Sequence, residues 1–401
     1  MTVKELRALF PQLSRIIYGK PLVYLDNAAT SLRPQPVTNS WLHYTTHSTS
    51  NLHRAVHRIA VEATRTYEDT RKSVAGFLNV QNANEIVFTS GATHSLNLLA
   101  FGIGEAFVKE GDEIIVSEAE HHSNLVPWQM MCRRRGAHLV RLPVDDNGRL
   151  QVELLPSLAS PRTRVVCVSH VSNVLGLVNP IEEITAFCRP RGILTVVDGA
   201  QGVVHCSVDV QRIGCDFYAF SGHKMYAVPG TGVLWGRMEL LELLPPLFGG
   251  GEMIESVSWE SSTYALPPRR FEAGTQNITG TPTLVAAIDL MAKMPPMDEL
   301  RDYVSAGLAA IEGLRVYGVP SQPEQKIPLF SFTIEGAHPE DRALILDKMG
   351  IAVRSGQMCA EPLMDRFGVT GMLRASFAPY NTMQEAEYFI TSLRKAITML
   401  R

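Results

Sequence analysis

The sequence lacks the features of membrane, exported and nucleic-acid-binding proteins. No stretch of the 401 residues approaches the roughly 18 uncharged apolar residues that a membrane-spanning helix needs. The N-terminal stretch MTVKELRALFPQLSR carries charges where a signal peptide needs an apolar run. Lysine and arginine (37) nearly balance aspartate and glutamate (40), and a net charge of -3 does not favour nucleic acid or an anionic membrane surface. We therefore expect a cytoplasmic protein with neither a membrane nor a nucleic-acid partner.

Cysteine motifs and dinucleotide motifs are also missing. The six cysteines have no C-x-x-C spacing, which argues against a zinc site and against a disulfide framework. We predict no metal centre, and we expect reduced thiols in a cytoplasmic chain. Cys132, Cys167 and Cys188 lie in helix-like or strand-like stretches and are interpreted as structural, whereas Cys206 and Cys215 are left open. No G-x-G-x-x-G opens a helix after the first strand of the larger domain, which argues against a nicotinamide dehydrogenase.

What is present is a regular alternation of apolar and amphipathic segments. Apolar residues make up 45% of the chain, enough for a large core. Between about residues 85 and 235 the alternation predicts a mostly parallel β-sheet covered by helices on both faces. We expect strands at 85–89, 113–117, 164–169, 194–198, 217–219 and 233–235, and helices at 92–108, 124–135 and 181–189. The arginines at 133–135 before Gly136 fit a helix C-terminus, where cations complement the dipole and glycine caps the end.

After about residue 290 the order of elements becomes mixed, which predicts a smaller α+β domain. We expect helices at 297–312, 339–349 and 383–400 and strands at 330–334, 351–354 and 373–377. We also expect the N-terminal helix to pack against this domain. The predicted organisation is an N-terminal segment (1–20) that packs with the small domain, a large domain (21–288) and a C-terminal small domain (289–401).

Polar side chains follow the predicted strands. Ligands of parallel α/β sheets bind at the carboxyl ends of the strands. Ser90-Gly91-Ala92-Thr93 forms a strand-to-helix turn, whose backbone N–H groups and hydroxyls suit a phosphate. The later strands are followed by further polar side chains: His121 and His122, then Asn173, then Asp198 and Gln201, and finally Ser221, His223 and Lys224.

Together these residues match the needs of pyridoxal phosphate. A carboxylate that ends an apolar strand, as Asp198 does, is costly unless it meets a cation, and the protonated pyridine nitrogen is one. A histidine ring such as that of His121 can stack on the cofactor, and Lys224 can form a Schiff base with it. Taken alone, Lys224 also fits a loop lysine that reaches solvent. The joint placement of these residues favours the cofactor.

Six motifs give the chain a specific resemblance to a known family. YLDNAAT (24–30), FTSGAT, EHHSN, VDGAQ, SGHKMYAVPGTGVL and FEAGTQN resemble class V, fold-type I pyridoxal-phosphate enzymes, above all the group II cysteine desulfurases and cysteine sulfinate desulfinases. The resemblance spans nearly the whole chain, and the 26 positions from Asp198 to Lys224 are its most specific part. It implies a seven-stranded-type, mostly parallel sheet in the large domain.

The resemblance also implies an activity and partners. The expected reaction converts L-cysteine to L-alanine, and it extends to L-cysteine sulfinate, which releases sulfite, and to L-selenocysteine, which releases selenium. The implied assembly is a homodimer whose site is shared between subunits. The sulfur is implied to pass to a small acceptor protein that serves iron–sulfur cluster assembly or tRNA modification.

Carried over residue by residue, the resemblance assigns roles. Lys224, Cys359 and His121 are the expected catalytic residues: Lys224 carries the cofactor and moves the Cα proton, and His121 stacks on the ring. Asp198 is implied to pair with the pyridine nitrogen and Gln201 with the phenolic oxygen. The implied phosphate contacts are Ala92, Thr93, Ser221, His223 and, from the other subunit, Thr275, and the implied contacts of the ring and of the substrate carboxylate are Asn173, Arg374 and Arg354.

The stretch VRSGQMCAEP (353–362) carries the candidate nucleophile, Cys359. Its flanking residues are typical of an accessible loop, although a buried core cysteine is the structural alternative. In the family, a cysteine here attacks the sulfur of the substrate and holds it as a persulfide. This step needs a thiolate, which cations such as Arg354 favour. Many group II members carry GHHC, whereas this chain has Gln357 and Met358 in place of both histidines, which suggests slow turnover without an acceptor protein.

Three points stay open. His53-Arg54 resembles a basic pair that enters the neighbouring subunit's site, but it also fits a solvated loop before a helix that begins near Val56. An aminotransferase of the same fold would not need Cys359 and would form pyruvate and pyridoxamine phosphate instead of alanine. A persulfide relay scaffold would depend on partner binding more than on catalysis.

Overall fold

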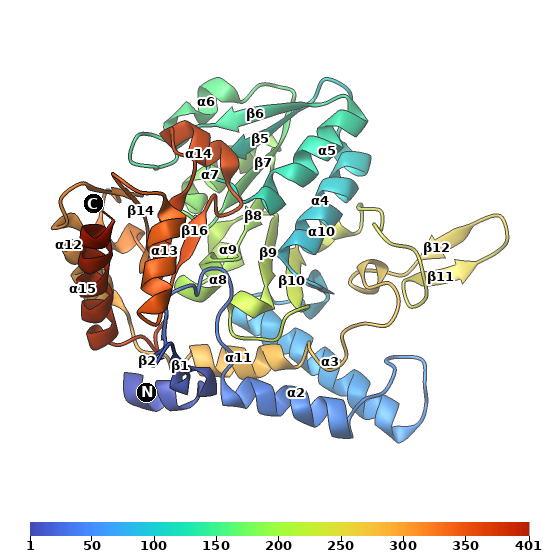
Figure 1. The fold of residues 1–401 in the computed structure, drawn as a ribbon. Helices are drawn as coiled ribbons and strands as arrows, with labels where there is room; N and C mark the ends of the chain where they lie inside the picture. The colour runs from blue at the N-terminus through green and yellow to red at the C-terminus, as the bar shows by residue number, and fades with distance from the viewer. Residues whose placement is uncertain (401) are drawn as a thin grey trace.

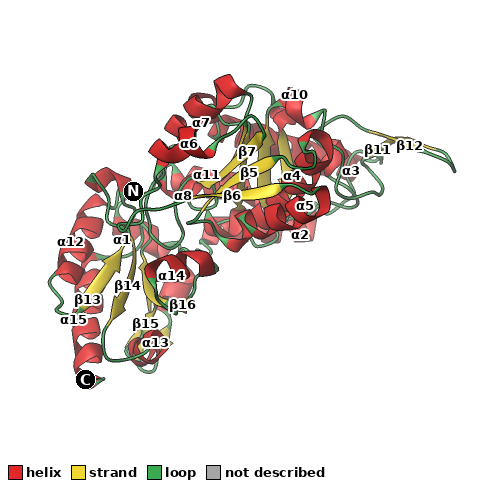
Figure 2. Ribbon diagram, turned by 90° about the horizontal axis from the view of Figure 1, so that it is seen from above, coloured by secondary structure: helices red, strands yellow, loops and turns green. Residues whose placement is uncertain are grey.

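The structure, a computed structural model, describes residues 1–400 and contains two main sheets in two lobes (Figures 1 and 2). The larger sheet has seven strands in the order β4-β10-β9-β8-β7-β5-β6. Its strands are β4 (Ile86–Thr89), β5 (Glu113–Ser117), β6 (His138–Leu142), β7 (Thr163–Ser169), β8 (Leu194–Asp198), β9 (Phe217–Ser221) and β10 (Gly232–Gly236). Neighbours from β9 to β6 run parallel, whereas β10 is antiparallel to both β9 and β4. The predicted α/β fold with a seven-stranded, mostly parallel sheet is confirmed.

Helices cover both faces of this sheet (Figure 2). They are α2 (Gln35–His47), α3 (Arg58–Phe77), α4 (Ala92–Phe107), α5 (Val126–Arg135), α6 (Leu155–Leu158), α7 (Ile181–Cys188), α8 (Gly202–His205), α9 (Val210–Ile213), α10 (Met238–Leu241) and α11 (Thr283–Met291). Helix α5 ends at Gly136, which adopts the left-handed conformation (φ 69°), so the predicted glycine cap after the three arginines is confirmed.

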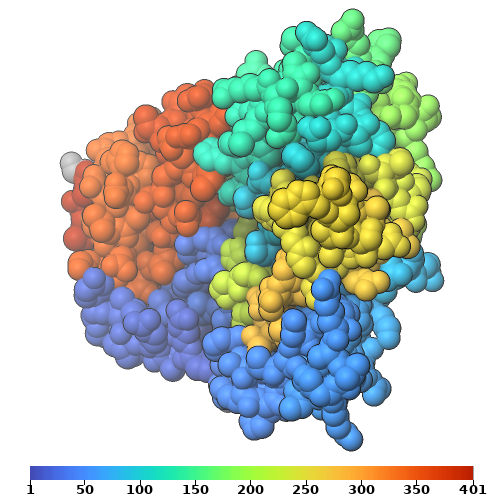
Figure 3. Space-filling model, turned by 90° about the vertical axis from the view of Figure 1, so that its right-hand side faces the viewer, coloured from blue at the N-terminus to red at the C-terminus, as the bar shows by residue number. Residues whose placement is uncertain are grey.

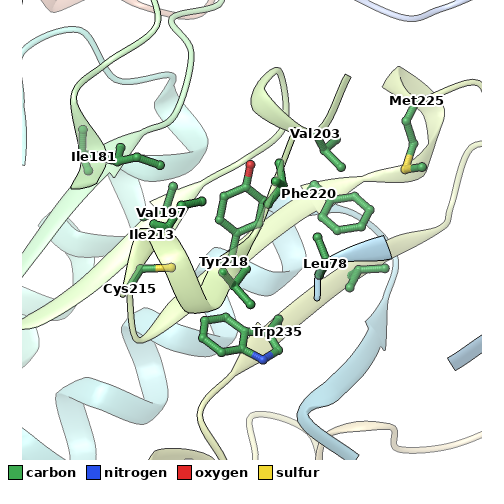
Figure 4. Packing of buried hydrophobic residues seen from close by; sticks show 14 of the residues in the cluster. Leu78, Ile181, Val197, Val203, Ile213, Cys215, Tyr218, Phe220, Met225 and Trp235 are labelled. Atoms are coloured by element: carbon green, nitrogen blue, oxygen red, sulfur yellow. The ribbon is translucent and has the colours of Figure 1, made fainter. Parts of the chain in front are cut away.

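The central strands β7, β8 and β9 are mostly apolar and almost entirely buried because helices cover both faces of the sheet. Along β9, Phe217 and Ala219 point into the core beneath α4 and α5, whereas Tyr218 and Phe220 point into the core on the other face. Figure 4 shows this second core, in which the Tyr218 ring lies among neighbours from several elements. Burying each large apolar side chain contributes about 1.5–3 kcal/mol, so this packing holds the strand ends in place.

The smaller lobe contains a four-stranded antiparallel sheet in the order β13-β14-β17-β16. Its elements are β13 (Leu314–Tyr317), β14 (Leu329–Ile334), β16 (Arg354–Gly356), β17 (Met372–Ser376), α12 (Asp298–Ala309), α13 (Pro339–Lys348), α14 (Glu361–Phe367) and α15 (Met383–Met399). A separate apolar core joins α12 and α15 to this sheet and includes Val304, Phe332 and Phe389. Helix α15 begins with a capping box between Thr382 and Glu385, which satisfies N–H groups at its first turn.

The N-terminal segment contacts both lobes. It comprises α1 (Val3–Ala8), the short pair β1 (Ile16–Ile17) and β2 (Lys20–Pro21), and β3 (Val23–Tyr24). Arg7 Nη1 donates a hydrogen bond to the Tyr380 carbonyl (2.8 Å), and Phe10 packs against Tyr226 near the large sheet. Strand β3 pairs in parallel with β15 (Ile351–Ala352) of the small lobe. Helix α11 continues across residue 288, where the sequence places a domain boundary.

A hairpin of β11 (Ile254–Val257) and β12 (Ser262–Tyr264) projects from the body of the molecule (Figure 1). It carries Trp259, which is 99% exposed. Figure 3 views the molecule from the side on which this hairpin stands out, drawn in yellow. Among residues 1–400, no helix is long and apolar enough to cross a membrane.

Candidate active site

The carboxyl ends of β5, β7, β8 and β9 meet at one edge of the large sheet, and the predicted polar residues follow them there. The small sheet supplies further residues from the opposite side. Between them lies a cavity of about 190 Å³. The predicted residues that line it are Ala92, Thr93, His121, Asn173, Asp198, Ser221, His223, Lys224, Arg354, Cys359 and Arg374.

One end of the cavity is a cradle of hydroxyls at the start of α4. Ser221 Oγ accepts the backbone N–H of Ala92 (2.7 Å), and the Thr93 and Ser123 hydroxyls are 2.7 Å apart. The N-terminus of a helix favours an anion because unpaired N–H groups and the helix dipole point at it. A Cβ on Gly232 would lie 2.3 Å from the Gly91 Cα, so only glycine lets β10 approach this turn. The arrangement suits a phosphate group.

Asp198 and Lys224 form a coupled pair in the middle of the cavity. Asp198 is 6% exposed, and Asp198 Oδ1 accepts the N–H of Ala200 (2.9 Å). Burial raises the pKa of Asp198, and the charge of Lys224 opposes that rise. Burial likewise lowers the pKa of Lys224, although Asp198 opposes that shift. A lysine that loses its proton readily is suited to form an imine, and a buried carboxylate is suited to meet a ring N–H cation.

His121 is held in one orientation above the edge of the sheet. Its Nδ1 accepts the backbone N–H of Ser123 (3.0 Å), so a neutral ring carries its proton on Nε2. Burial first, and the charge of Lys224 second, lowers the pKa of His121 to about 3. The ring is therefore neutral near pH 7, which suits stacking on an aromatic cofactor.

The turn that carries Lys224 is fastened by the N-terminal segment. The His223 carbonyl accepts hydrogen bonds from Ser31 Oγ (3.0 Å) and Arg33 Nη2 (3.0 Å). His223 Nδ1 is 3.1 Å from Thr30 Oγ1. Burial lowers the pKa of His223 to about 4, which keeps this ring neutral beside Lys224. These contacts fix the backbone immediately before the reactive amine.

Two arginines of the small sheet face the cavity around one carboxylate. Arg374 Nη2 lies 3.1 Å from Asp26 Oδ1, and Arg354 Nη1 lies 3.8 Å from Asp26 Oδ2. Arg374 Nη1 donates to the Asn173 carbonyl (2.8 Å). Among the described residues, none accepts a hydrogen bond from the buried Arg374 Nε. Arg374 lines the cavity, and a guanidinium there can bind the carboxylate of an amino acid.

Cys359 is exposed, so the alternative of a buried core cysteine is wrong. Cys132, Cys167 and Cys188 are buried on α5, β7 and α7, as the sequence predicts. Cys359 thus combines an accessible sulfur with a position on the wall of the cavity.

Four predicted site residues lie outside the cavity lining. Gln201 is buried beside it and donates to the Ala28 carbonyl (2.8 Å). His53 Nε2 lies 3.0 Å from Glu68 Oε1, and Arg54 Nε lies 2.9 Å from Glu252 Oε1, so both side chains pair within their own chain. Thr275 lines a separate hollow of about 730 Å³, which Thr93 also lines.

Sequence reasoning assigned no role to several residues that the structure places at the site. Asp26 contacts both arginines, and the cavity lining also contains Ala28, Ala29, Ser123, Ala200 and Met358. The motifs YLDNAAT and EHHSN contain Asp26 and Ser123, so the signal was present, but spacing alone did not assign these residues a contact.

A comparison with protein families identifies the chain. The model described as "Aminotransferase class-V" matches residues 23–389. The chain belongs to the class-V aminotransferase family. Members of this family depend on pyridoxal phosphate, so the predicted cofactor is confirmed. The residues fit it: among those described, no hydrogen bond reaches the second oxygen of the buried Asp198, Lys224 faces the same cavity, and the α4 cradle provides an anion site.

Relatives within the class-V family are similar over their full length. A protein of Vibrio cholerae named "Probable cysteine desulfurase" is 41% identical, with 100% of both chains covered. The crystal structure of the cysteine desulfurase CsdA from Escherichia coli has a TM-score of 0.91 at 38% identity and covers 100% of both chains. The apo structure of a cysteine desulfurase from Thermococcus onnurineus has a TM-score of 0.94 at 37% identity, covering 100% of this chain and 99% of that one. These matches confirm the resemblance to cysteine desulfurases.

Proposed function

We propose that this chain is a cysteine desulfurase that converts L-cysteine to L-alanine and takes the sulfur on Cys359. The observation that carries the proposal is the exposed Cys359 on the wall of the cavity that also holds Lys224 and Arg374. An aminotransferase needs the lysine and the arginine but has no use for a thiol at that place. Similar proteins named cysteine desulfurase support the assignment.

Bound pyridoxal phosphate supplies an electron sink for the charge that develops at Cα. Lys224 holds the cofactor and then takes the Cα proton on Nζ. The second oxygen of Asp198 would pair with the ring nitrogen, neutral His121 would stack on the ring, and Gln201 would bond the phenolic oxygen. The hydroxyl cradle of α4, with Thr93, Ser221 and the backbone of Ala92, would hold the phosphate, and His223 would add a further contact.

Arg374 would bind and orient the carboxylate of the amino acid through its guanidinium, with Arg354 nearby. Asn173, which lines the same cavity, would lie near this carboxylate and the ring. The thiolate of Cys359 attacks the substrate sulfur, an S–S bond forms, and the Cβ–S bond breaks. Cβ then gains a proton and Lys224 returns its proton to Cα, so the products are alanine and a persulfide on Cys359.

We extend the proposal to L-cysteine sulfinate and L-selenocysteine. Sulfite and selenium can leave without a nucleophile, so Cys359→Ala loses activity on cysteine but largely keeps activity on cysteine sulfinate. An equal loss of both activities, assayed as alanine formation, would remove Cys359 from its proposed role.

We propose a cytoplasmic homodimer that hands its sulfur to a small acceptor protein. Within one chain the hollow around Thr275 adjoins the phosphate cradle at Thr93, and in the proposed dimer Thr275 of one subunit would reach the phosphate of the other. His53 and Arg54 would act across the same interface. An unchanged Michaelis constant in Arg54→Ala for every substrate would exclude that role. We keep the division into residues 1–20, 21–288 and 289–401 as a proposal.

The decisive experiment records the visible spectrum of the purified protein, adds L-cysteine, and assays alanine and protein-bound persulfide. We expect a cofactor band, alanine, and a persulfide that Cys359→Ala abolishes. Pyruvate in place of alanine would instead support the aminotransferase. Retained delivery of sulfur by Lys224→Ala would support the relay scaffold. A colourless protein that cannot be reconstituted would refute the proposal.

A further inference from the structure

Met358 and Cys359 occupy a backbone conformation that ordinary side chains avoid. Their φ angles are 55° and 56°, in the left-handed region, and neither residue is glycine. Each such residue costs of the order of 1 kcal/mol, so two in succession persist only where surrounding contacts hold them. The loop that carries the candidate nucleophile therefore needs a restraint from outside.

That restraint comes from the large domain. Asn173 Nδ2 donates a hydrogen bond to the Met358 carbonyl (2.9 Å), and both residues are buried. The backbone N–H of His122 donates to the Cys359 carbonyl (2.8 Å). Both carbonyls of the left-handed pair thus accept hydrogen bonds from loops at the carboxyl ends of the large sheet.

The side chain of His122 adds a third contact. His122 Nε2 accepts the backbone N–H of Glu361 (3.2 Å), the first residue of α14. The imidazole therefore caps the helix that follows the nucleophile, and no side chain of the loop itself caps it. The Glu361 carboxylate lies farther away, 3.8 Å from the same nitrogen.

We propose that His122 and Asn173 are the positioning residues of Cys359, which together hold Met358 and Cys359 in the left-handed turn. This rests on the proposed function, in which Cys359 accepts sulfur. Gln357 and Met358 stand where many group II relatives have histidines, and His122 reaches this loop through space from the other domain.

The test compares His122→Ala, His122→Gln and the control Glu361→Gln in the holoenzyme. His122→Ala loses the cap, whereas Gln can still accept the N–H, and Glu361→Gln keeps the backbone donor. We expect His122→Ala to lower kcat for cysteine about fivefold, the factor set by losing one helix-capping hydrogen bond. In His122→Ala, the KM for cysteine stays at the parent value, and so does the rate of sulfite release from cysteine sulfinate. His122→Gln restores kcat for cysteine, and Glu361→Gln matches the parent.

A second readout does not depend on turnover. Amide hydrogen exchange of residues 357–361 should be faster in His122→Ala and unchanged in Glu361→Gln. An equal fall in both activities, parent-like exchange in His122→Ala, or the same loss in Glu361→Gln would overturn the positioning role. If the parent protein itself forms no persulfide on Cys359, the proposed function falls and this inference falls with it. If the parent forms the persulfide and His122→Ala has the same kcat for cysteine as the parent, only the positioning role of His122 is refuted, and the proposed function stands.

Discussion

The buried ion pair between Arg71 and Glu272 gives the strongest prediction about stability. Arg71 Nη1 and Nη2 lie 2.7 and 2.9 Å from the two oxygens of Glu272, and each side chain is 1% exposed. Glu272 Oε1 also accepts the backbone N–H of Phe88 (2.7 Å) on β4. The pair thereby ties α3 and the segment that leads to Thr275 to the large sheet.

Glu272→Gln removes one charge of this pair and leaves the other in place. Removing one partner of a buried pair costs about 3–5 kcal/mol, because the remaining charge stays buried and uncompensated. Glu68 still contacts Arg71 Nε (2.8 Å) and is 35% exposed, so we expect the lower end of that range. At about 2 °C per kcal/mol for a large domain, the melting temperature should fall by about 6 °C.

Thermal unfolding at fixed protein and cofactor concentration measures this change. Glu68→Gln is the matched control, because it removes a partly exposed partner of the same arginine and should cost about 1 kcal/mol or less. The double variant Arg71→Met/Glu272→Gln should recover part of the loss, since it leaves no buried charge. If Glu272→Gln melts within 1 °C of Glu68→Gln, at roughly the parent value, the reasoning about the buried charge is wrong.

Two further predictions concern titration and charge. Burial raises the pKa of Glu120 to about 7 from an ordinary value of 4.5. The stabilisation by Glu120 is therefore complete below about pH 4.5 and is lost as the pH rises through about 7. Glu120→Gln should make the melting temperature less dependent on pH between these values. If the melting temperature falls with pH as steeply as in the parent, Glu120 is not the source of that dependence. Asp26→Asn adds one net positive charge beside Arg374 and Arg354. Because cysteine sulfinate carries one more anionic group than cysteine, its kcat/KM should rise relative to that for cysteine by about fivefold, the equivalent of about 1 kcal/mol for a solvent-screened charge pair. A constant ratio would show that Asp26 does not balance the charge of the substrate.

The elements that sequence patterns predict well are those buried on both faces. Strands β5 and β8 match their predicted bounds, 113–117 and 194–198, because continuous apolar runs report burial. Strand β6 was missed because it lies at the sheet edge, and four of its five residues are at least partly exposed. The hairpin strands β11 and β12 were missed for the same reason, since they bury no apolar face.

The site divides along a similar line. Asp198 and Lys224 could be found because Asp198 ends one recognisable strand and Lys224 follows another, and the sheet topology brings strand ends together. The contact of Asp26 with Arg374 depends on where β3 docks beside the small sheet, and a one-dimensional pattern carries no such information. The same holds for His122, whose capping of α14 joins two loops that are far apart in the chain.

The N-terminal segment has a consequence for how the molecule can move. Strand β3 is hydrogen-bonded to β15 of the small lobe. A few residues later, Ser31 and Arg33 donate hydrogen bonds to the carbonyl of His223, the residue before Lys224. A swing of the small lobe would therefore pull on the backbone of the reactive lysine through a tether of only a few residues. We therefore expect opening of the substrate cleft and alignment of the amine to be mechanically coupled, and a cut between Tyr24 and Ser31 to uncouple them.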